Sequence, residues 1–93
     1  MKIAINTCYG GFSLSEEALA LYKEYAGVLP SLEDEDRSDP LLIRVIEQLG
    51  TERAAAKGRG HKLKIIDIPE GVEWEIRNKD GIEIVVEKHR SWF

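Results

Sequence analysis

The residues that could bind a ligand are concentrated in a glycine-containing turn near the start of the chain: Cys8, Tyr9, Gly10, Gly11, Phe12 and Ser13. Two adjacent glycines permit positive φ angles or a close approach of the backbone to a ligand. A helix is expected directly after this turn, and the free N–H groups and dipole of a helix start can hold a phosphate or a carboxylate. The alternative is a tight turn in which Phe12 anchors the backbone to the core, and the sequence leaves both interpretations open.

A concentrated positive segment is the second candidate for anion binding. Its charged residues are Lys57, Arg59, Lys62 and Lys64, with His61 among them. No acidic residue lies between Glu52 and Asp67. These charges would complement the glycine turn in an anion site. A solvated basic loop is the competing interpretation.

Two further arginines could reach a ligand. His89 and Arg90 precede Trp92, so this segment offers a planar cation and an aromatic ring that can stack on a base. Packing of Trp92 over a sheet edge is the simpler alternative. Arg37 lies just before Asp39 at a predicted helix start, where it could contact a ligand or pair with nearby acidic side chains.

The sequence contains no motif for catalysis, for a metal ion or for a cofactor. Cys8 is the only cysteine, and it would act as a nucleophile only if a helix start favoured its thiolate and if His61 or His89 lay within hydrogen-bonding distance. We favour an inert, buried thiol. The two histidines lack the spacing of a metal site. A non-enzymatic protein without a cofactor is therefore expected.

Length and composition indicate one small domain that spans residues 1–93. The 93 residues are 43% hydrophobic and 32% charged, and the net charge is −4. A core of this size gives limited stability, so association of identical subunits would add useful burial. The first apolar stretch is too short for a signal peptide, and no run approaches the roughly 20 apolar residues of a membrane span. We therefore expect a cytoplasmic homo-oligomer without membrane contact or general attraction to nucleic acid.

The chain is predicted to begin with a strand and a helix. Alternating apolar residues predict the strand over residues 2–6. The helix is predicted to start at a Ser13 or Ser15 cap and to end near Gly27, which can adopt the left-handed cap conformation.

A loop and a second helix are predicted to follow. Residues 28–39 contain the acidic run 33–36 and lack apolar periodicity, which predicts a solvated loop. Asp39 and Pro40 form a strong helix start, because aspartate caps free N–H groups and proline suits the first helical position. This helix is predicted to end at Gly50.

A β-hairpin is predicted in the last third of the sequence. Asp80 and Gly81 form its turn between alternating segments at 72–76 and 82–86. Trp74 is expected to face the core. The acidic side chains of the other face are expected in water, and they are Glu73, Glu75, Glu83 and Glu87.

One more strand completes the predicted fold. Residues 63–68 are apolar on both faces, which is typical of a central strand. The resulting order is β-α-α-β-β-β. It indicates an α+β fold in which two helices pack on one face of a mainly antiparallel sheet.

Three parts of the chain also carry a family resemblance. They are Met-Lys-Ile-Ala-Ile-Asn-Thr-Cys-Tyr-Gly-Gly-Phe-Ser-Leu-Ser at the N-terminus, Arg37-Ser38-Asp39-Pro40, and residues 63–92 with Val-Glu-Trp-Glu-Ile and Lys-His-Arg-Ser-Trp. In these parts the chain resembles a family of short proteins encoded by tailed phages and prophages. The resemblance covers most of the chain and implies a viral origin and a host-cell setting. The family carries no established activity, so it assigns no catalytic or binding residues.

The function expected from these observations is that of a phage accessory protein. Such proteins often act against host defence, either by blocking a defence protein or by sequestering a nucleotide signal, and this analogy sets the expectation. We expect a binding protein that captures a small anionic, nucleotide-derived signal between subunits of a homo-oligomer. The alternatives are an inhibitor that binds a host protein through the acidic loop and a Cys8-dependent hydrolase.

Overall fold

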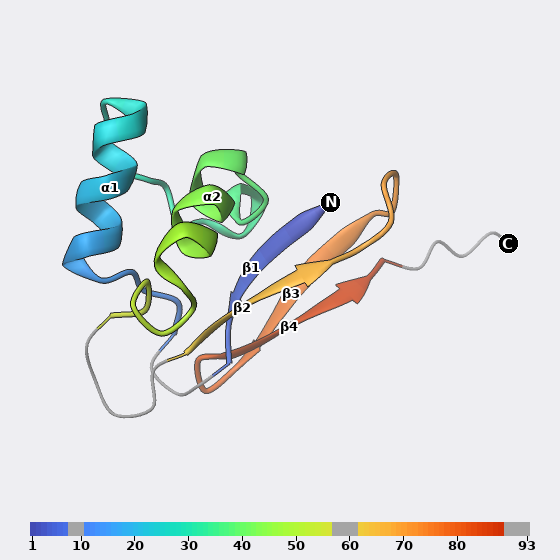
Figure 1. The fold of residues 1–93 in the computed structure, drawn as a ribbon. Coiled ribbons are helices and arrows are strands. Elements are labelled where there is room, and N and C mark those ends of the chain that lie inside the picture. The colour runs from blue at the N-terminus through green and yellow to red at the C-terminus, as the bar shows by residue number, and fades with distance from the viewer. Residues whose placement is uncertain (8–10, 57–61, 89–93) are drawn as a thin grey trace, which may run out of the picture.

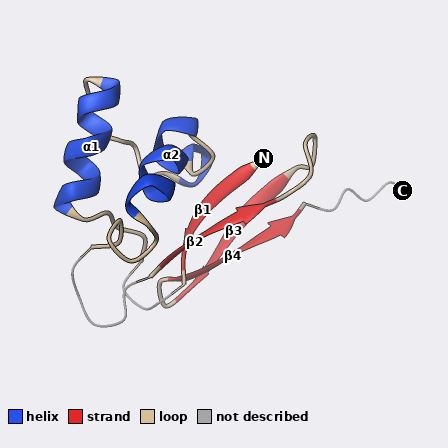
Figure 2. Cartoon of the chain, in the orientation of Figure 1, coloured by secondary structure: helices blue, strands red, loops and turns tan. Residues whose placement is uncertain are grey.

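The structure, a computed structural model, describes residues 1–7, 11–56 and 62–88. The elements of the first two parts are strand β1 (Lys2–Asn6), helix α1 (Glu16–Ala26), the 3-10 helix η1 (Asp34–Asp36) and helix α2 (Pro40–Leu49). The elements of the last part are strands β2 (Leu63–Asp67), β3 (Trp74–Lys79) and β4 (Ile82–Glu87). Both α-helices lie on one side of the strands (Figure 1, Figure 2). The predicted α+β class and the β-α-α-β-β-β order are confirmed.

Helix α1 is capped at both ends by residues that the sequence singled out. Ser15 is the N-cap, and its Oγ accepts a hydrogen bond of 3.1 Å from the backbone N–H of Ala18. Gly27 ends the helix with a φ of 78°, a left-handed conformation that glycine adopts without steric cost. Between the two predicted start positions, the structure therefore selects Ser15 over Ser13.

Helix α2 begins at a carboxylate that also binds a side chain of α1. The Oδ1 atom of Asp39 accepts a hydrogen bond of 2.9 Å from the N–H of Leu41, and Pro40 occupies the first helical position. The hydroxyl of Tyr22 donates to the other carboxylate oxygen of Asp39. This hydrogen bond, reinforced by burial, raises the pKa of Tyr22 from 10.0 to about 12. Asp39 therefore joins the two helices as well as capping one of them.

The main core lies between the helices and the antiparallel β1–β2 ladder. The ladder pairs Ala4 with Ile65, and side chains on this face pack against the helices. Ile3 and Ile5 alternate with Ala4 and are also buried, so both faces of β1 are covered. The buried residues of the main cluster are Ala4, Leu14, Ala18, Tyr22, Leu42, Ile43, Val45, Ile46, Ala54, Ala55 and Leu63.

The described strands form two separate ladders, β1–β2 and β3–β4, instead of one sheet. The contacts along the edge of β1 that faces away from β2 explain the separation. The N–H of Ala4 donates to the carbonyl of Arg37 at 2.9 Å, and the N–H of Asn6 donates to the Glu83 carboxylate at 2.8 Å. A loop and a side chain thus occupy the edge where a third strand would pair. Among the described strands, β2 pairs only with β1 and is not the central strand that its apolar residues suggested.

The β3–β4 hairpin has the predicted turn, but Glu83 and Glu87 lie on the same face as Trp74 and not on the opposite face as predicted. Asp80 and Gly81 form the tip with φ angles of 55° and 86°, and Lys79 pairs with Ile82. Cross-strand partners share a face, and a two-residue turn pairs each even-numbered residue with an odd-numbered one. The partly buried Trp74 therefore lies on the same face of the hairpin as Glu83, and Ile82 lies on the other face.

Glu83 is the clearest departure from the predicted pattern of water-facing acidic residues. It is only 3% exposed. The segment that pairs with it also differs from the expected solvated loop, because Arg37 within residues 28–39 is 4% exposed. Within this segment the acidic residues of η1 remain largely at the surface, while Arg37 turns inward.

Candidate anion-binding site

The end of the β1–β2 ladder brings together the two segments that the sequence proposed for anion binding. Asn6 pairs with Leu63 at this end. One residue further, Thr7 donates two hydrogen bonds to the carbonyl oxygen of Lys62, from its backbone N–H at 3.1 Å and from its hydroxyl at 3.0 Å. Thr7 directly precedes the glycine turn, and Lys62 belongs to the positive segment of residues 57–64. The glycine turn therefore begins, and the positive segment ends, at the same end of the ladder.

An open pocket of about 570 Å³ lies at this point. The described residues that line it are Thr7, Thr51, Lys62, Leu63, Lys64 and Ile65. They include two exposed ammonium groups, two side chains with hydroxyl groups and no carboxylate. Ammonium and hydroxyl groups are donors that phosphate and carboxylate oxygens accept from. The pocket thus has the chemistry of an anion site.

Backbone contacts fix the walls of the pocket. The N–H of Leu63 donates to the carbonyl of Thr51 at 3.4 Å, which ties the segment after α2 to the start of β2. Lys64 pairs with Ile5 in the β1–β2 ladder, and Thr7 directly follows β1. Hydrogen bonds therefore hold the backbone of the pocket in place, and only the long lysine side chains need to adjust to a ligand.

The described part of the glycine turn has a structural role. Gly11 has a φ of +83°, and an added Cβ would meet no atom within 4 Å, so the backbone angle and not crowding selects glycine here. Phe12 stacks on Arg37, with the guanidinium carbon 3.8 Å from the ring centroid. Ser13 accepts a backbone hydrogen bond from Ala56 at 3.4 Å. These contacts match the interpretation in which Phe12 anchors the turn to the core.

The start of α1 is already satisfied by its own cap. Ser15 caps the helix by accepting from Ala18, and its hydroxyl donates to the carbonyl of Arg53 at 2.7 Å. Gly11 lies several residues before this cap. The predicted contribution of the helix start to anion binding therefore has no direct support at Gly11, and the lysine pocket carries the electrostatic argument instead.

Arg37 lies in a buried ion pair and not on the surface. Its Nη1 and Nη2 atoms lie 2.6 Å and 3.0 Å from the two carboxylate oxygens of Glu83, and its Nε donates to the carbonyl of Leu32 at 3.0 Å. With the Phe12 ring on one side, the guanidinium is enclosed. Between the two roles that the sequence left open, the structure shows pairing, with Glu83 as the buried partner and Asp34 at 3.9 Å.

Sequence reasoning missed three residues that the structure brings into this region. Thr7 and Thr51 line the pocket, and Glu83 holds Arg37. The position of Thr7 beside the glycine turn was a usable signal. Thr51 and Glu83 gave none, because their roles depend on contacts with segments far away in the sequence.

Most of the predicted ligand-binding residues lie outside the described residues. They are Cys8, Tyr9, Gly10, Arg59, His61, His89, Arg90 and Trp92. Across the ranges 1–7, 11–56 and 62–88, no group of three or more His, Cys, Asp or Glu side chains is placed to hold a metal ion. In the same ranges, no helix has the length and apolar character needed to cross a membrane.

Comparison with known proteins adds no assignment to this geometry. No family model matches the chain, and no curated protein or solved structure is significantly similar to it.

Proposed function

We propose that the protein is a non-enzymatic binding protein that captures a small, phosphate-bearing, nucleotide-derived anion in the pocket beside Thr7, Lys62 and Lys64. One observation carries the proposal. The pairing of Asn6 with Leu63 places Thr7, the residue before the glycine turn, and Lys62 of the positive segment on one pocket. The residue that precedes the glycine turn and two lysines of the positive segment thus lie at one place.

The charge distribution of the whole chain supports a local site. The net charge is −4, so an anion is not attracted by the molecule as a whole. It would be attracted by the pair of lysines in the pocket, where no carboxylate is among the described lining residues. A small ligand with several negative charges fits this arrangement better than an extended polyanion such as nucleic acid.

The biological setting in this proposal comes from the family resemblance. A phage accessory protein that binds a nucleotide-derived signal in the host cytoplasm would remove that signal from a defence pathway. Association of identical subunits is part of the proposal, because additional burial would stabilise a domain with so small a core.

Isothermal titration calorimetry with pyrophosphate, ADP-ribose and a cyclic dinucleotide tests this proposal. Lys64→Gln removes one pocket charge and should weaken binding of a phosphate ligand about three- to tenfold. Lys23→Gln removes an equally exposed lysine from α1, far from the pocket, and should leave the affinity unchanged. Added salt should weaken binding by the parent more than binding by Lys64→Gln, because fewer charges remain to be screened. Equal losses in both variants, or no binding of any of the three ligands, would contradict the proposal.

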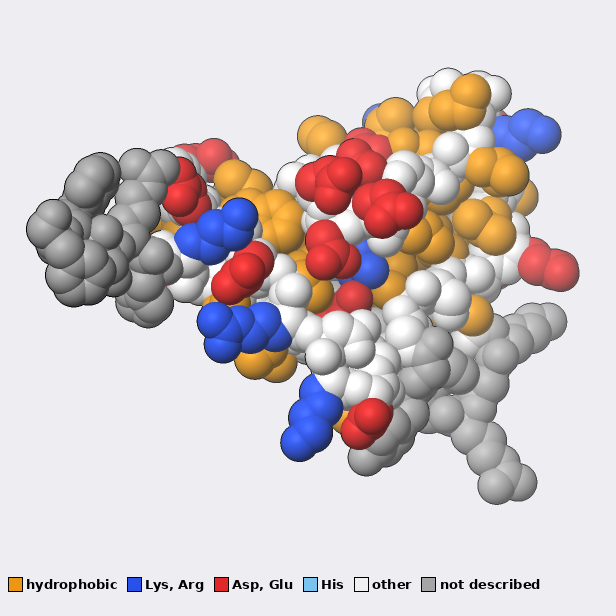
Figure 3. Space-filling model, turned by 180° about the vertical axis from the view of Figure 1, so that it is seen from behind, with side chains coloured by type: hydrophobic (Ala, Val, Ile, Leu, Met, Phe, Trp, Pro, Cys, Tyr) orange, Lys and Arg blue, Asp and Glu red, His pale blue; other side chains and the backbone are white. Residues whose placement is uncertain are grey.

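A second candidate function, inhibition of a host protein, is favoured by the surface around η1. Acidic side chains gather beside apolar ones on the face seen in Figure 3. Glu33, Asp34 and Glu35 are exposed, and the nearby Val28 and Leu29 are 63% and 62% exposed. Such a surface suits a partner with a basic and apolar patch.

Separate variants distinguish the two functions. Replacing Glu33, Asp34 and Glu35 with Gln, Asn and Gln neutralises the acidic surface and leaves the lysine pocket intact. If this variant binds nucleotide normally but no longer supports phage growth on a defended host, protein inhibition replaces nucleotide capture as the function. The Cys8-dependent hydrolase is tested by Cys8→Ser, which should retain full activity under the binding proposal.

A further inference from the structure

A second pocket lies on the outer face of the β3–β4 hairpin. Because the two-residue turn pairs Lys79 with Ile82 and Arg77 with Ile84, these four side chains share the face opposite Glu83. Glu83 binds Arg37 in the interior, so the opposite face turns outward. This geometry exposes apolar side chains on a strand, and Ile84 is 54% exposed.

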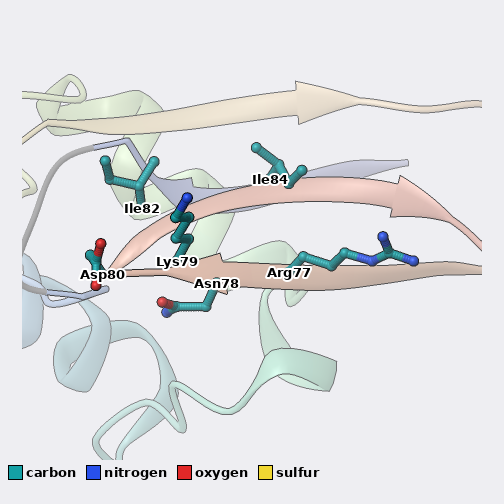
Figure 4. Close-up of a pocket in the computed structure, with 6 residues that line it drawn as sticks. All are labelled: Arg77, Asn78, Lys79, Asp80, Ile82 and Ile84. Carbon is teal, nitrogen blue, oxygen red and sulfur yellow. The ribbon is translucent and has the colours of Figure 1, made fainter.

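The pocket on this face combines an apolar floor with positive charges. Its volume is about 440 Å³, and it is lined by Arg77, Asn78, Lys79, Asp80, Ile82 and Ile84. Figure 4 shows Lys79, Ile82 and Ile84 projecting to one side of the hairpin, while the Arg77 side chain extends along β3. Arg77 also contacts Glu75 at 3.4 Å, a pair that is exposed to solvent. Volumes of this size accommodate a small organic ligand.

Asn6 links the tip of the hairpin to the strand end beside the lysine pocket. The side-chain amide of Asn6 donates a hydrogen bond of 2.7 Å to the carbonyl of Gly81, at the hairpin tip beside Asp80. The next residue, Thr7, lines the lysine pocket. The backbone N–H of Asn6 is also bound by Glu83, so the hairpin is held to β1 by two hydrogen bonds at this point. The hairpin tip, beside Asp80 of one pocket, is therefore fixed to the end of β1, beside Thr7 of the other.

We infer that the hairpin pocket binds the base and sugar of the ligand whose phosphates occupy the lysine pocket. The inference rests on the proposed function and names the ligand class as a nucleoside phosphate instead of a simple inorganic anion. Ile82 and Ile84 offer an apolar surface for one face of a base, since burying such surface is favourable. Arg77 can lie over the other face of the base, because a planar guanidinium stacks on aromatic rings.

Comparing ADP with inorganic pyrophosphate tests the inference, because the two share a diphosphate and only ADP carries a base and sugar. The parent should bind ADP about tenfold more tightly than pyrophosphate. Ile84→Ala and Arg77→Ala should each remove most of this difference without changing the affinity for pyrophosphate. Leu29→Ala, which truncates an apolar side chain of similar exposure elsewhere, should change neither affinity. Lys64→Gln should weaken the binding of both ligands.

The outcomes separate this inference from the function on which it rests. Binding of pyrophosphate and ADP with equal affinity, or an unchanged preference in Ile84→Ala, would overturn the inference and leave the lysine pocket standing. Binding of neither ligand would overturn both. Light scattering on the same proteins adds one outcome. A smaller particle mass in Ile84→Ala with unchanged ADP affinity would show that this face is a subunit interface, which also overturns the inference.

Discussion

Arg37 and Glu83 form a buried two-point ion pair, with Nη1–Oε1 and Nη2–Oε2 distances of 2.6 Å and 3.0 Å. The pair joins the segment before α2 to the hairpin, and the Glu83 carboxylate also accepts from the N–H of Asn6. The ring of Phe12 covers the guanidinium. One side-chain contact thus holds the hairpin, the edge of β1 and the end of the glycine turn in place.

Removing one member of this pair should destabilise the fold strongly. Glu83→Leu leaves the Arg37 charge buried without its partner and deprives the N–H of Asn6 of its acceptor. The expected loss is about 3–5 kcal/mol in the free energy of unfolding, measured by urea denaturation. Glu75→Leu is the matched control, because the Glu75–Arg77 pair lies on the same hairpin but is exposed. It should change stability by less than about 1 kcal/mol. Similar losses in both variants would show that the buried pair has no special role.

Replacing both members of the pair should recover part of the lost stability. Arg37→Met combined with Glu83→Leu leaves no unpaired charge in the interior, and apolar replacements of buried ion pairs are often tolerated. The double variant is therefore expected to be more stable than Glu83→Leu alone in the same denaturation experiment. A double variant less stable than the single one would show that Arg37 makes other contacts that matter more, such as its bond to Leu32.

The hydrogen bond between Tyr22 and Asp39 should make stability sensitive to alkaline pH. The pKa of Tyr22 is raised from 10.0 to about 12 because the protonated hydroxyl donates to the Asp39 carboxylate. The folded state therefore retains the proton more strongly than the unfolded chain. This contribution is fully present below pH 10 and is lost as the pH rises from about 10 to about 12. Tyr22→Phe should lower the free energy of unfolding by about 1–3 kcal/mol at neutral pH.

Tyr22→Phe should also remove the alkaline loss of stability, and denaturation at a series of pH values checks this. Between pH 10 and 12 the stability of Tyr22→Phe should decrease less than that of the parent. Tyr25→Phe removes an exposed hydroxyl that bonds to Gln48, and it should follow the parent curve. Parallel curves for the parent and Tyr22→Phe would contradict the assignment of the alkaline loss to this hydrogen bond.

Gly11→Ala should reduce stability through its backbone angle. The φ of +83° is costly for a residue with a Cβ, while the space around that Cβ is free. The expected loss is about 1–2 kcal/mol. Gly11→Asn should lose less, because asparagine adopts positive φ angles more readily than alanine. Thermal unfolding compares the two variants, and a larger loss for Asn would indicate crowding instead of backbone strain. If the glycine turn also contacts the anion, Gly11→Ala should weaken nucleotide binding beyond the effect of its reduced stability.

The elements that the sequence predicted correctly are those controlled by neighbouring residues. Ser15 and Gly27 cap the two ends of α1, and Asp39 caps the start of α2. Asp80 and Gly81 form the turn of the hairpin. Each of these features depends on a cap or a turn angle within a few residues.

Features that depend on distant contacts could not be read in this way. Glu83 alternates with apolar residues and therefore suggested a water-facing position, but its partner Arg37 lies 46 residues away. The faces of the hairpin were predictable in principle, because the turn at Asp80 and Gly81 already fixes which residues share a face. The meeting of Thr7 and Lys62 depends on the β1–β2 register, which local patterns do not specify.

The most direct test of the proposed site is an NMR titration of the ¹⁵N-labelled protein with sodium pyrophosphate, with sodium chloride of matched ionic strength as the control. If the pocket binds the anion, saturable shifts should appear and should be largest for the backbone amides of Thr7, Thr51, Lys62 and Lys64, the polar residues of the pocket. The amides of α1 should remain unchanged. Absence of saturable shifts at these four residues, or larger shifts around η1 or α1, would contradict the assignment of anion binding to this pocket.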